Sequence, residues 1–255
     1  MRTGLRARVR VVAGAVALLA ATAGPAVVSA QDPITREQAD TLIQEIRQLR
    51  RAIEGLRAPA RPAERPRDEK VRVDLTGVHA LGRADAPLTL VEFTDLECPF
   101  CRTFHVNVFE RLKREYIDTG KLRFVSRDFP LDFHPNARPA ALAVRCAGAQ
   151  GKFWEMRHEV TLKAAALGPD LYVALARALA LDVDKLSACI TAQTYAAEID
   201  RDVADATSAG VSGTPSFVLG PTTPGPAFEG VRIVGAQPYA AFEARIKALL
   251  AAPPK

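Results

Sequence analysis

The sequence has few of the residues that build metal centres, with four cysteines and four histidines in 255 residues. No cysteine precedes Cys98, which excludes a lipid-modified cysteine near a processed N-terminus. One Cys-x-x-Cys pair is present, without a second pair or a closely spaced histidine pair, so we expect no four-ligand structural zinc site. The histidines are scattered along the chain: His79, His105, His134 and His158.

Acidic residues are absent from positions 1–30, which carry four arginines. Without this segment the formal net charge falls from +5 to +1 (5 − 4), so the basic pI does not indicate a nucleic-acid partner. A basic start, an apolar run from Val11 to Ala23 and small residues at Val28 and Ala30 predict a signal peptide over 1–30, cleaved before Gln31. An uncleaved anchor is the alternative, although the run is shorter than the ~20 residues of a membrane span. Export to an oxidising compartment such as the periplasm favours cysteine pairing over metal binding.

Residues 31–58 predict a helix. Asp32-Pro33 suits a helix start, and Thr35 with Gln38 has capping-box spacing. The apolar positions then follow a heptad seam: Ala39, Leu42, Ile46, Leu49, Ile53 and Leu56. This seam favours a homodimer, or a trimer, through residues 35–57. A helix packed on its own domain is the alternative. Prolines at 59, 62 and 66 predict an extended linker over 59–70.

Residues 71–255 alternate between strand and helix patterns. We predict strands at Val71–Leu75, Leu88–Thr94, Lys121–Phe129, Ser216–Leu219 and Val231–Val234. We predict helices after Cys98 and at Ala140–Ala149, Phe153–Ala166, Leu171–Leu181, Val183–Thr191, Tyr195–Ser208 and Pro238–Ala251. The order indicates an α/β fold with a mixed sheet of four or five strands and a helical insertion over about 135–210.

Cys98-Pro99-Phe100-Cys101 lies between a predicted buried strand and a predicted helix. At a helix N-terminus the first thiol favours its thiolate, so Cys98 is the expected nucleophile, with Cys101 the more buried partner. This context favours a redox dithiol over half of a metal site, although soft Cu(I) can bind a reduced pair. We expect His105 to be an exposed helix residue.

Glu92 lies in the apolar strand before the motif, where an acid is costly unless it has a role. A buried carboxyl with a raised pKa would accept the proton of Cys101, whereas the alternative is a strand-edge glutamate that reaches solvent. Asp95 and Glu97 are interpreted as surface charges.

Gly213-Thr214-Pro215 precedes a predicted strand, and its Thr-Pro bond is a candidate cis peptide. A proline there donates no N–H, which leaves a short backbone edge for an extended substrate.

Several motifs together resemble the DsbA-like branch of the thioredoxin superfamily over about residues 81–250: Val91–Asp95 with Cys98–Cys101, Arg127–Pro130, Ala140–Ala147, Gln150–Trp154 and Gly210–Pro215. The resemblance implies a thioredoxin-like fold with a helical insertion. It implies that Cys98 is the nucleophile, Cys101 the resolving cysteine and Glu92 the buried acid. It also implies a cis Pro215 opposite the motif and a backbone contact from Thr214 to the substrate. We expect Pro215, Pro99 and Phe100 to contact the substrate as well.

Two features depart from this resemblance. Founding members carry histidine at the position of Phe100, and phenylalanine donates no hydrogen bond to the thiolate, so we expect a less oxidising couple. The N-terminal helix is similar to that of oligomeric relatives of the DsbC, DsbG and ScsC type, which act as isomerases or reductases.

Cys146 and Cys189 either form a bridge, as in some DsbA-like relatives, or stay as separate buried thiols. A bridge would close a loop of roughly 44 residues and contribute about 4 kcal/mol in the chain-entropy model. The role would be structural.

These patterns predict an exported thiol-disulfide oxidoreductase that needs no cofactor or metal. The expected partners are unfolded or partly folded secreted proteins and a membrane redox protein, with no nucleic acid. The alternatives are an oligomeric isomerase or reductase and, from another class, a periplasmic chaperone or copper-binding module.

Overall fold

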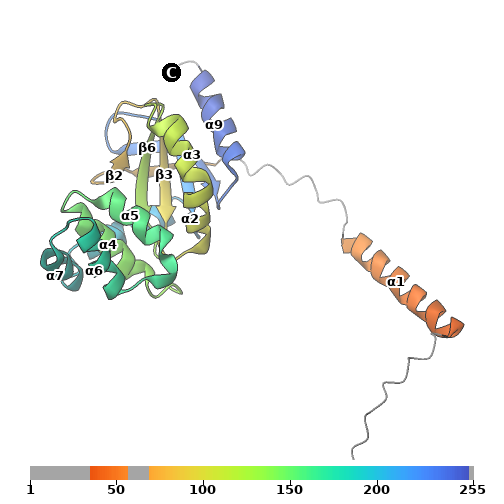
Figure 1. Ribbon diagram of the computed structural model, residues 1–255. Helices are drawn as coiled ribbons and strands as arrows, with labels where there is room; N and C mark the ends of the chain where they lie inside the picture. Colours follow the sequence, from red (N-terminus) through yellow and green to blue (C-terminus); the bar gives the residue numbers. More distant parts are fainter. Residues whose placement is uncertain (1–34, 57–68, 253–255) are drawn as a thin grey trace, which may run out of the picture. The chain divides into compact units, whose positions relative to one another are not determined.

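The computed structural model describes residues 35–56 and 69–252, which form a separate helix and a folded domain (Figure 1). The chain divides into two units, residues 1–62 and 63–255, each of which is described by itself. The predicted signal peptide and all but the end of the predicted linker lie outside the described residues. Among the described residues, no helix is both long and apolar enough to span a membrane.

Helix α1 (Arg36–Leu56) begins at the capping box that the sequence predicts. The Gln38 N–H donates to Thr35 Oγ1 at 3.3 Å, and the Thr35 N–H donates to Gln38 Oε1 at 3.0 Å. Both bonds satisfy donors that the first helical turn leaves free. One side of the helix presents apolar side chains that are 44–62% exposed: Leu42, Ile43, Ile46 and Leu49.

In the described part of the chain, the domain is built on one six-stranded sheet with the order β1-β6-β5-β3-β4-β2. The strands are β1 (Lys70–Asp74), β2 (His79–Leu81), β3 (Leu88–Thr94), β4 (Leu122–Asp128), β5 (Ser216–Pro221) and β6 (Ala227–Val234). The β3–β4 pair is parallel and the other pairs are antiparallel. The α/β fold class is confirmed, but the predicted number of strands is wrong. The missed strand, β2, has three residues, too few to show alternation.

Strand β3 occupies the middle of the sheet, and all seven of its residues are buried. On one face its side chains join a core formed with α2 (Pro99–Phe104), the turns that follow it and α9 (Tyr239–Ala251). On the other face they join a core that includes α8 (Ala196–Ser208). A strand covered on both faces reads as a continuous apolar run, which explains why its boundaries were predicted correctly.

The helix that starts at Pro99 contains two π-helical turns. It continues from α2 through a π-helical turn η1 (His105–Phe109), α3 (Glu110–Leu112) and a second π-helical turn η2 (Lys113–Ile117). Five apolar residues recur at helical spacing along this helix, and all are buried: Phe104, Val108, Phe109, Leu112 and Tyr116. A π turn inserts an extra residue into the helical register, a feature found frequently at functional sites.

Five α-helices occupy residues 137–208 between β4 and β5: α4 (Ala137–Gly148), α5 (Phe153–Leu162), α6 (Pro169–Ala178), α7 (Val183–Thr191) and α8. Side chains of α4 to α7 enclose a third core that includes Met156, Leu175 and Leu186. The predicted helix over 153–166 is in fact α5 followed by a 3-10 turn, η3 (Ala164–Ala166). Leu167 then leaves the helical region, and Gly168 and Pro169 start α6.

Buried ion pairs join these helices to the sheet. Arg127 of β4 donates from Nε to Asp202 Oδ1 at 2.5 Å. Arg145 of α4 donates to Asp128 Oδ2 and to Asp202 Oδ2, each at 2.5 Å. Burial, followed by the neighbouring Asp128 charge, raises the pKa of Asp202 to about 6. Removing any one of Arg127, Arg145, Asp128 and Asp202 would leave a buried charge without its partner. Each of these four side chains is therefore stabilised in the interior by the others.

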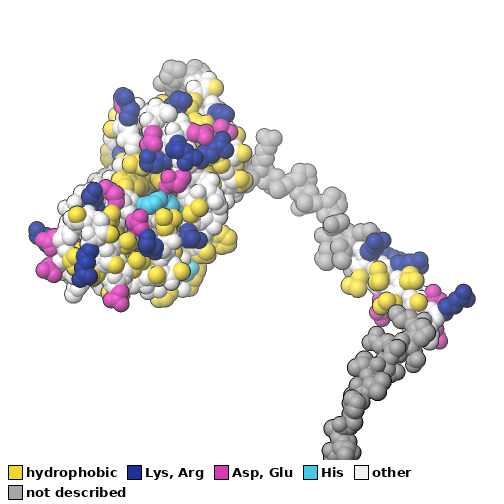
Figure 2. Space-filling model, viewed as in Figure 1, with side chains coloured by type: hydrophobic (Ala, Val, Ile, Leu, Met, Phe, Trp, Pro, Cys, Tyr) yellow, Lys and Arg dark blue, Asp and Glu magenta, His cyan; other side chains and the backbone are white. Residues whose placement is uncertain are grey.

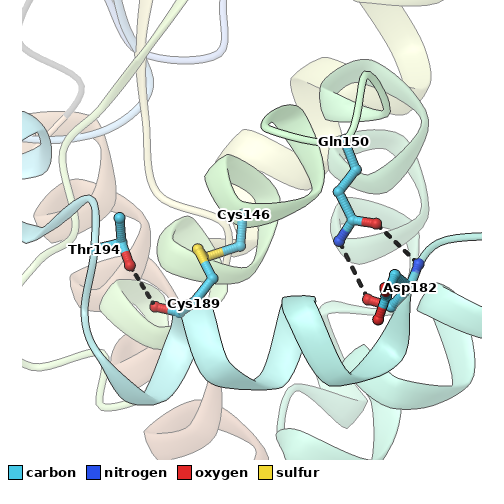
Figure 3. The surroundings of a disulfide bond; sticks show 5 residues. All are labelled: Cys146, Gln150, Asp182, Cys189 and Thr194. Carbon is cyan, nitrogen blue, oxygen red and sulfur yellow. Dashed lines mark hydrogen bonds between the residues drawn. A yellow bond between two sulfur atoms is a disulfide. The ribbon is translucent and has the colours of Figure 1, made fainter.

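A disulfide joins Cys146 of α4 to Cys189 of α7, with a Cα–Cα distance of 5.9 Å (Figure 3). Beside it, Gln150 and Asp182 exchange two hydrogen bonds: the Asp182 N–H donates to Gln150 Oε1 at 2.8 Å, and Gln150 Nε2 donates to the Asp182 carbonyl at 3.2 Å. Asp182 also caps α7 by accepting the Lys185 N–H. The start and the last turn of α7 are therefore both fastened to the α4 region.

We expect the double variant Cys146→Ser/Cys189→Ser to lose about 4 kcal/mol of unfolding free energy, because the unfolded chain regains the entropy of the opened loop. Chemical denaturation of the two proteins measures this loss. Both should carry Cys98→Ser and Cys101→Ser, so that the active-site thiols do not exchange with the bridge. A loss below 1 kcal/mol would contradict the expectation.

Candidate active site

Cys98 lies where the central strand passes into the first helix. β3 ends at Thr94, and a three-residue turn connects it to α2. Cys98 is the N-cap of α2, and Pro99 is the first residue of the helix. Its carbonyl accepts the Arg102 N–H at 3.1 Å. Cys101 follows on the first turn and is buried against the core. Both cysteines are free thiols.

Asp95 organises this turn, and its interpretation as a surface charge is wrong, since it is 1% exposed. Its Oδ1 accepts the N–H groups of Glu97 at 2.7 Å and Cys98 at 3.1 Å. Its Oδ2 accepts the Leu131 N–H at 2.9 Å and lies 2.8 Å from His134 Nδ1. The carboxylate is tolerated in the interior because four donors surround it.

Glu97 is also not a free surface charge. It is half-buried, and it accepts the Asn136 N–H at 2.7 Å and Asn136 Nδ2 at 3.0 Å. Asn136 is the N-cap of α4, so this pair of bonds connects the motif to the start of the helical insertion.

The two thiols have nearly the same exposed fraction, 3% for Cys98 and 2% for Cys101. Surface area therefore does not distinguish them as predicted, but their surroundings do. Hydrogen bonding from the Cys101 thiol, with further help from Thr214 and the Cys101 and Phe100 N–H groups, lowers the pKa of Cys98 to about 5. Burial, that same hydrogen bond and the Glu92 charge raise the pKa of Cys101 well above its usual value. Cys98 is thus the thiolate of the pair.

The Thr214–Pro215 peptide bond is cis and stands immediately before β5. Because Ser216 pairs with Phe93, this bond lies beside the end of β3 from which the Cys98 turn departs. The Cys98 thiol donates to the Thr214 carbonyl at 3.5 Å. The structure thereby brings together Cys98, Cys101, Thr214 and Pro215, which are far apart in the sequence.

Glu92 is 1% exposed and points into the interior, not to solvent. Arg157 of α5 donates to its Oε2, and also donates from Nε to Ser126 Oγ at 3.0 Å. Glu92 Oε1 accepts no hydrogen bond within the described residues. Burial raises the pKa of Glu92, and the Arg157 charge opposes that rise.

Sequence reasoning missed Arg157. It follows Glu92 by 65 positions, on a helix whose apolar pattern gives no sign of a charged partner. The buried carboxylate was itself the signal that some cation must lie opposite it.

His105 is buried, with 2% exposure, and its expected exposure is wrong. It stacks on Phe109, and its Nδ1 lies 3.5 Å from Arg157 Nη1. Burial and the Arg157 charge lower the pKa of His105 to about 3. On its other side His105 approaches His158 and Glu110, which offer metal-ligating atoms.

Apolar side chains are exposed in the motif and in a neighbouring loop. Pro99 is exposed, and Phe100 is 64% exposed. Phe133, in the loop that Asp95 holds through Leu131 and His134, is 74% exposed. Large aromatic side chains exposed beside a reactive group commonly mark a contact surface for another protein.

We expect the alkylation rate of reduced Cys98 by iodoacetamide to have its midpoint near pH 5. Only the thiolate reacts, so the rate should be flat above about pH 6 and fall about tenfold per pH unit below the midpoint. Mass spectrometry of the modified peptide measures it. In Cys101→Ala the midpoint should move upward, because the strongest donor to Cys98 is gone. A wild-type midpoint near the ~8.5 of a free cysteine would contradict this prediction.

Among curated proteins, the chain is 38% identical over 153 residues to a Na(+)/H(+) antiporter NhaA of Salinispora arenicola, which covers 60% of this chain and 23% of the antiporter. It is 53% identical over 51 residues to a probable disulfide bond formation protein D of Bacillus cereus, covering 20% of this chain and 24% of that protein. The chain thus spans less than a quarter of the length of these relatives.

Among solved structures, alpha-DsbA1 of Wolbachia pipientis is 27% identical, with a TM-score of 0.62 over 69% of this chain and 92% of that one. DsbA2 of Pseudomonas aeruginosa is 27% identical, with a TM-score of 0.54 over 69% and 96%. BdbD of Bacillus subtilis, at 22% identity and a TM-score of 0.64 over 72% and 98%, shares the fold. A thioredoxin family model matches residues 74–229. That match runs from the end of β1 into β6, well over half of the chain, and places the chain in the thioredoxin family.

Proposed function

We propose that the chain is an exported thiol-disulfide oxidoreductase that forms or exchanges disulfides in secreted proteins. The observation that carries the proposal is the opposite displacement of the two thiol pKa values, lowered at Cys98 and raised at Cys101. One sulfur is then ready to attack or to leave, and the other is kept protonated until it must act. The likeness to DsbA structures and to a disulfide bond formation protein supports it.

In the oxidising direction, a substrate thiolate attacks Sγ of Cys98 in the Cys98–Cys101 disulfide. The Cys98–Cys101 bond breaks, and Cys101 leaves as a thiolate and takes a proton. A second substrate thiolate then attacks the substrate sulfur of the mixed disulfide, and Cys98 leaves as a thiolate. The substrate loses two electrons and the protein gains them. The reverse sequence reduces a substrate.

Glu92 is proposed to move the proton of Cys101. Its charge influences Cys101 from within the same buried region, and its Oε1 has no donor among the described residues. In the oxidising direction it gives a proton to the departing Cys101 thiolate, and in the reducing direction it takes that proton back.

The oxidising direction is favoured over isomerisation because stabilising the Cys98 thiolate stabilises the reduced protein, which makes the disulfide form a stronger oxidant. The motif lacks a histidine at Phe100, but donors from Cys101 and the backbone lower the pKa without it. The Cys146–Cys189 bridge supports export, since such bonds persist in oxidising compartments.

Unfolded secreted proteins are the proposed substrates. Phe100 and Phe133 offer apolar contacts, and the cis Pro215 turn offers the Thr214 backbone beside Cys98. A membrane redox protein that reoxidises the dithiol is the proposed second partner, because turnover needs an electron acceptor.

We expect the oxidised protein to restore a reduced multi-disulfide substrate to activity, and Cys98→Ser to abolish this. Cys101→Ser should accumulate mixed disulfides with substrate on non-reducing gels, because nothing resolves them. Glu92→Gln should keep the binding of substrate but slow resolution by the ~10²-fold or more that general acid–base catalysis supplies. The matched control is Glu159→Gln, an acid outside this chemistry.

Full activity of Cys98→Ser would contradict the proposal and favour a chaperone that uses no thiol chemistry. Rescue of a scrambled substrate at a rate equal to oxidation of a reduced one would replace the oxidising direction by isomerisation.

We also propose that α1 holds two or three copies of the chain together, through the exposed apolar side of Leu42, Ile46 and Leu49. A single helix with this much apolar surface gains stability by packing against identical helices.

Sedimentation should therefore give a single chain per particle for a version lacking residues 31–58 and for Leu49→Asp, against two or three for the intact chain. Gln48→Asp, a charge placed beside the seam position, is the control and should leave the number of chains unchanged. An intact chain that sediments as a monomer would contradict this.

A further inference from the structure

Three potential metal ligands, none of them a thiol, meet on one side of the domain. His105 Nε2 lies 3.0 Å from His158 Nδ1, and Glu110 Oε1 lies 3.8 Å from the former and 3.6 Å from the latter. Tetrahedral coordination at ~2.0–2.2 Å puts neighbouring ligand atoms roughly 3.2–3.6 Å apart. The three ligand atoms are thus already spaced approximately as three corners of a tetrahedron around a small metal ion.

The π turn η1 creates this arrangement. In a regular α-helix, residues five apart point in different directions, but π-helical bonding runs from i to i+5 and brings them to the same side. His105 opens η1 and Glu110 follows it, so the extra residue aligns their side chains. His158 then approaches from α5. A sequence search for ligands at helical spacing cannot find this set.

A pocket of about 400 Å³ opens beside the cluster and is lined by all three residues, with Phe109 and Trp154 among its walls. Histidine side chains reach this face of the domain close to carboxylates (Figure 2). Two histidines, one carboxylate and an open position match the ligand set of zinc sites that keep a water as the fourth ligand.

The positive charges near the cluster are already engaged. Lys113 Nζ donates to both carboxylate oxygens of Asp118, at 2.8 and 2.9 Å. Arg157 is paired with Glu92 and Ser126. With an ion on His105 Nε2 and His158 Nδ1, the hydrogen bond between these two atoms is replaced by bonds to the metal. The neutral His105 ring then carries its proton on Nδ1, and the long 3.5 Å contact from Arg157 to that atom is given up too.

We propose that His105, Glu110 and His158 bind one zinc ion, with a water in the pocket completing the coordination. The ion fastens α5 of the helical insertion to the helix that continues from Cys98. This site uses neither thiol of the dithiol, and the proposal does not depend on the proposed redox function.

The test is calorimetric titration of zinc chloride into the full chain, purified without a histidine tag and with Cys98 and Cys101 oxidised, so that the thiols cannot bind metal. We expect one ion per chain. His158→Ala should weaken binding by more than the ~10–100-fold that loss of an outer-shell partner costs, and Glu110→Gln should weaken it also. Glu159→Gln, in the wall of the same pocket but outside the cluster, should bind as the wild type does.

Two further measurements distinguish binding from misfolding. Zinc should raise the melting temperature of the oxidised wild type and of Glu159→Gln, but not that of His158→Ala, whose circular dichroism should match the wild type. Co²⁺ should give visible d–d bands without sulfur-to-metal charge transfer. An oxidised chain that binds no zinc, or a His158→Ala variant that binds it unchanged, would overturn the proposal.

Discussion

The ion pair between Glu92 and Arg157 is the constraint on which the site depends. A carboxylate in the middle of a strand buried on both faces is tolerable only if a cation is delivered to it. That cation comes from α5, so the helical insertion contributes a residue to the candidate active site and is more than an addition to the thioredoxin core. Two further features hold the insertion in place and thereby fix the position of Arg157. They are the buried ion pairs of Arg127, Arg145 and Asp202, and the Cys146–Cys189 bridge.

The same buried region treats the two sulfurs differently although both are nearly inaccessible. Hydrogen bonding from Cys101, with smaller contributions from the Thr214 side chain and from backbone N–H groups, lowers the pKa of Cys98 and so stabilises a negative charge there. Burial and the nearby Glu92 carboxyl group raise the pKa of Cys101, and it has fewer hydrogen-bond donors than Cys98. A negative charge on Cys101 is therefore unfavourable. Asp95 holds the turn that makes this asymmetry possible, by accepting the Cys98 N–H and giving its own N–H to Cys101 Sγ at 3.5 Å.

The sequence was sufficient for features that are local. Leu88–Thr94 and Val183–Thr191 have the predicted boundaries, and the capping box of α1 is present, because each depends on residues close together in the chain. The errors concern long-range placement. Asp95 and His105 were assigned to the surface, whereas each is buried by partners that lie tens of residues away: Leu131 and His134 for Asp95, Arg157 and His158 for His105. Strand β2 was missed because three residues paired at an edge leave no periodic signal.

The two edges of the sheet bear on how the protein, in its proposed function, avoids lasting strand pairing with the unfolded chains it acts on. Open strand edges invite another polypeptide to add as an extra strand, which is the first step towards aggregation. Here one edge is the three-residue β2, and the other is β1, whose Lys70, Arg72 and Asp74 are exposed charges. Both edges are poor templates for pairing. In the proposed function, binding of a substrate chain is therefore limited to the short segment between Cys98 and the cis Pro215 turn, where its release depends on sulfur chemistry and not on the slow separation of strands.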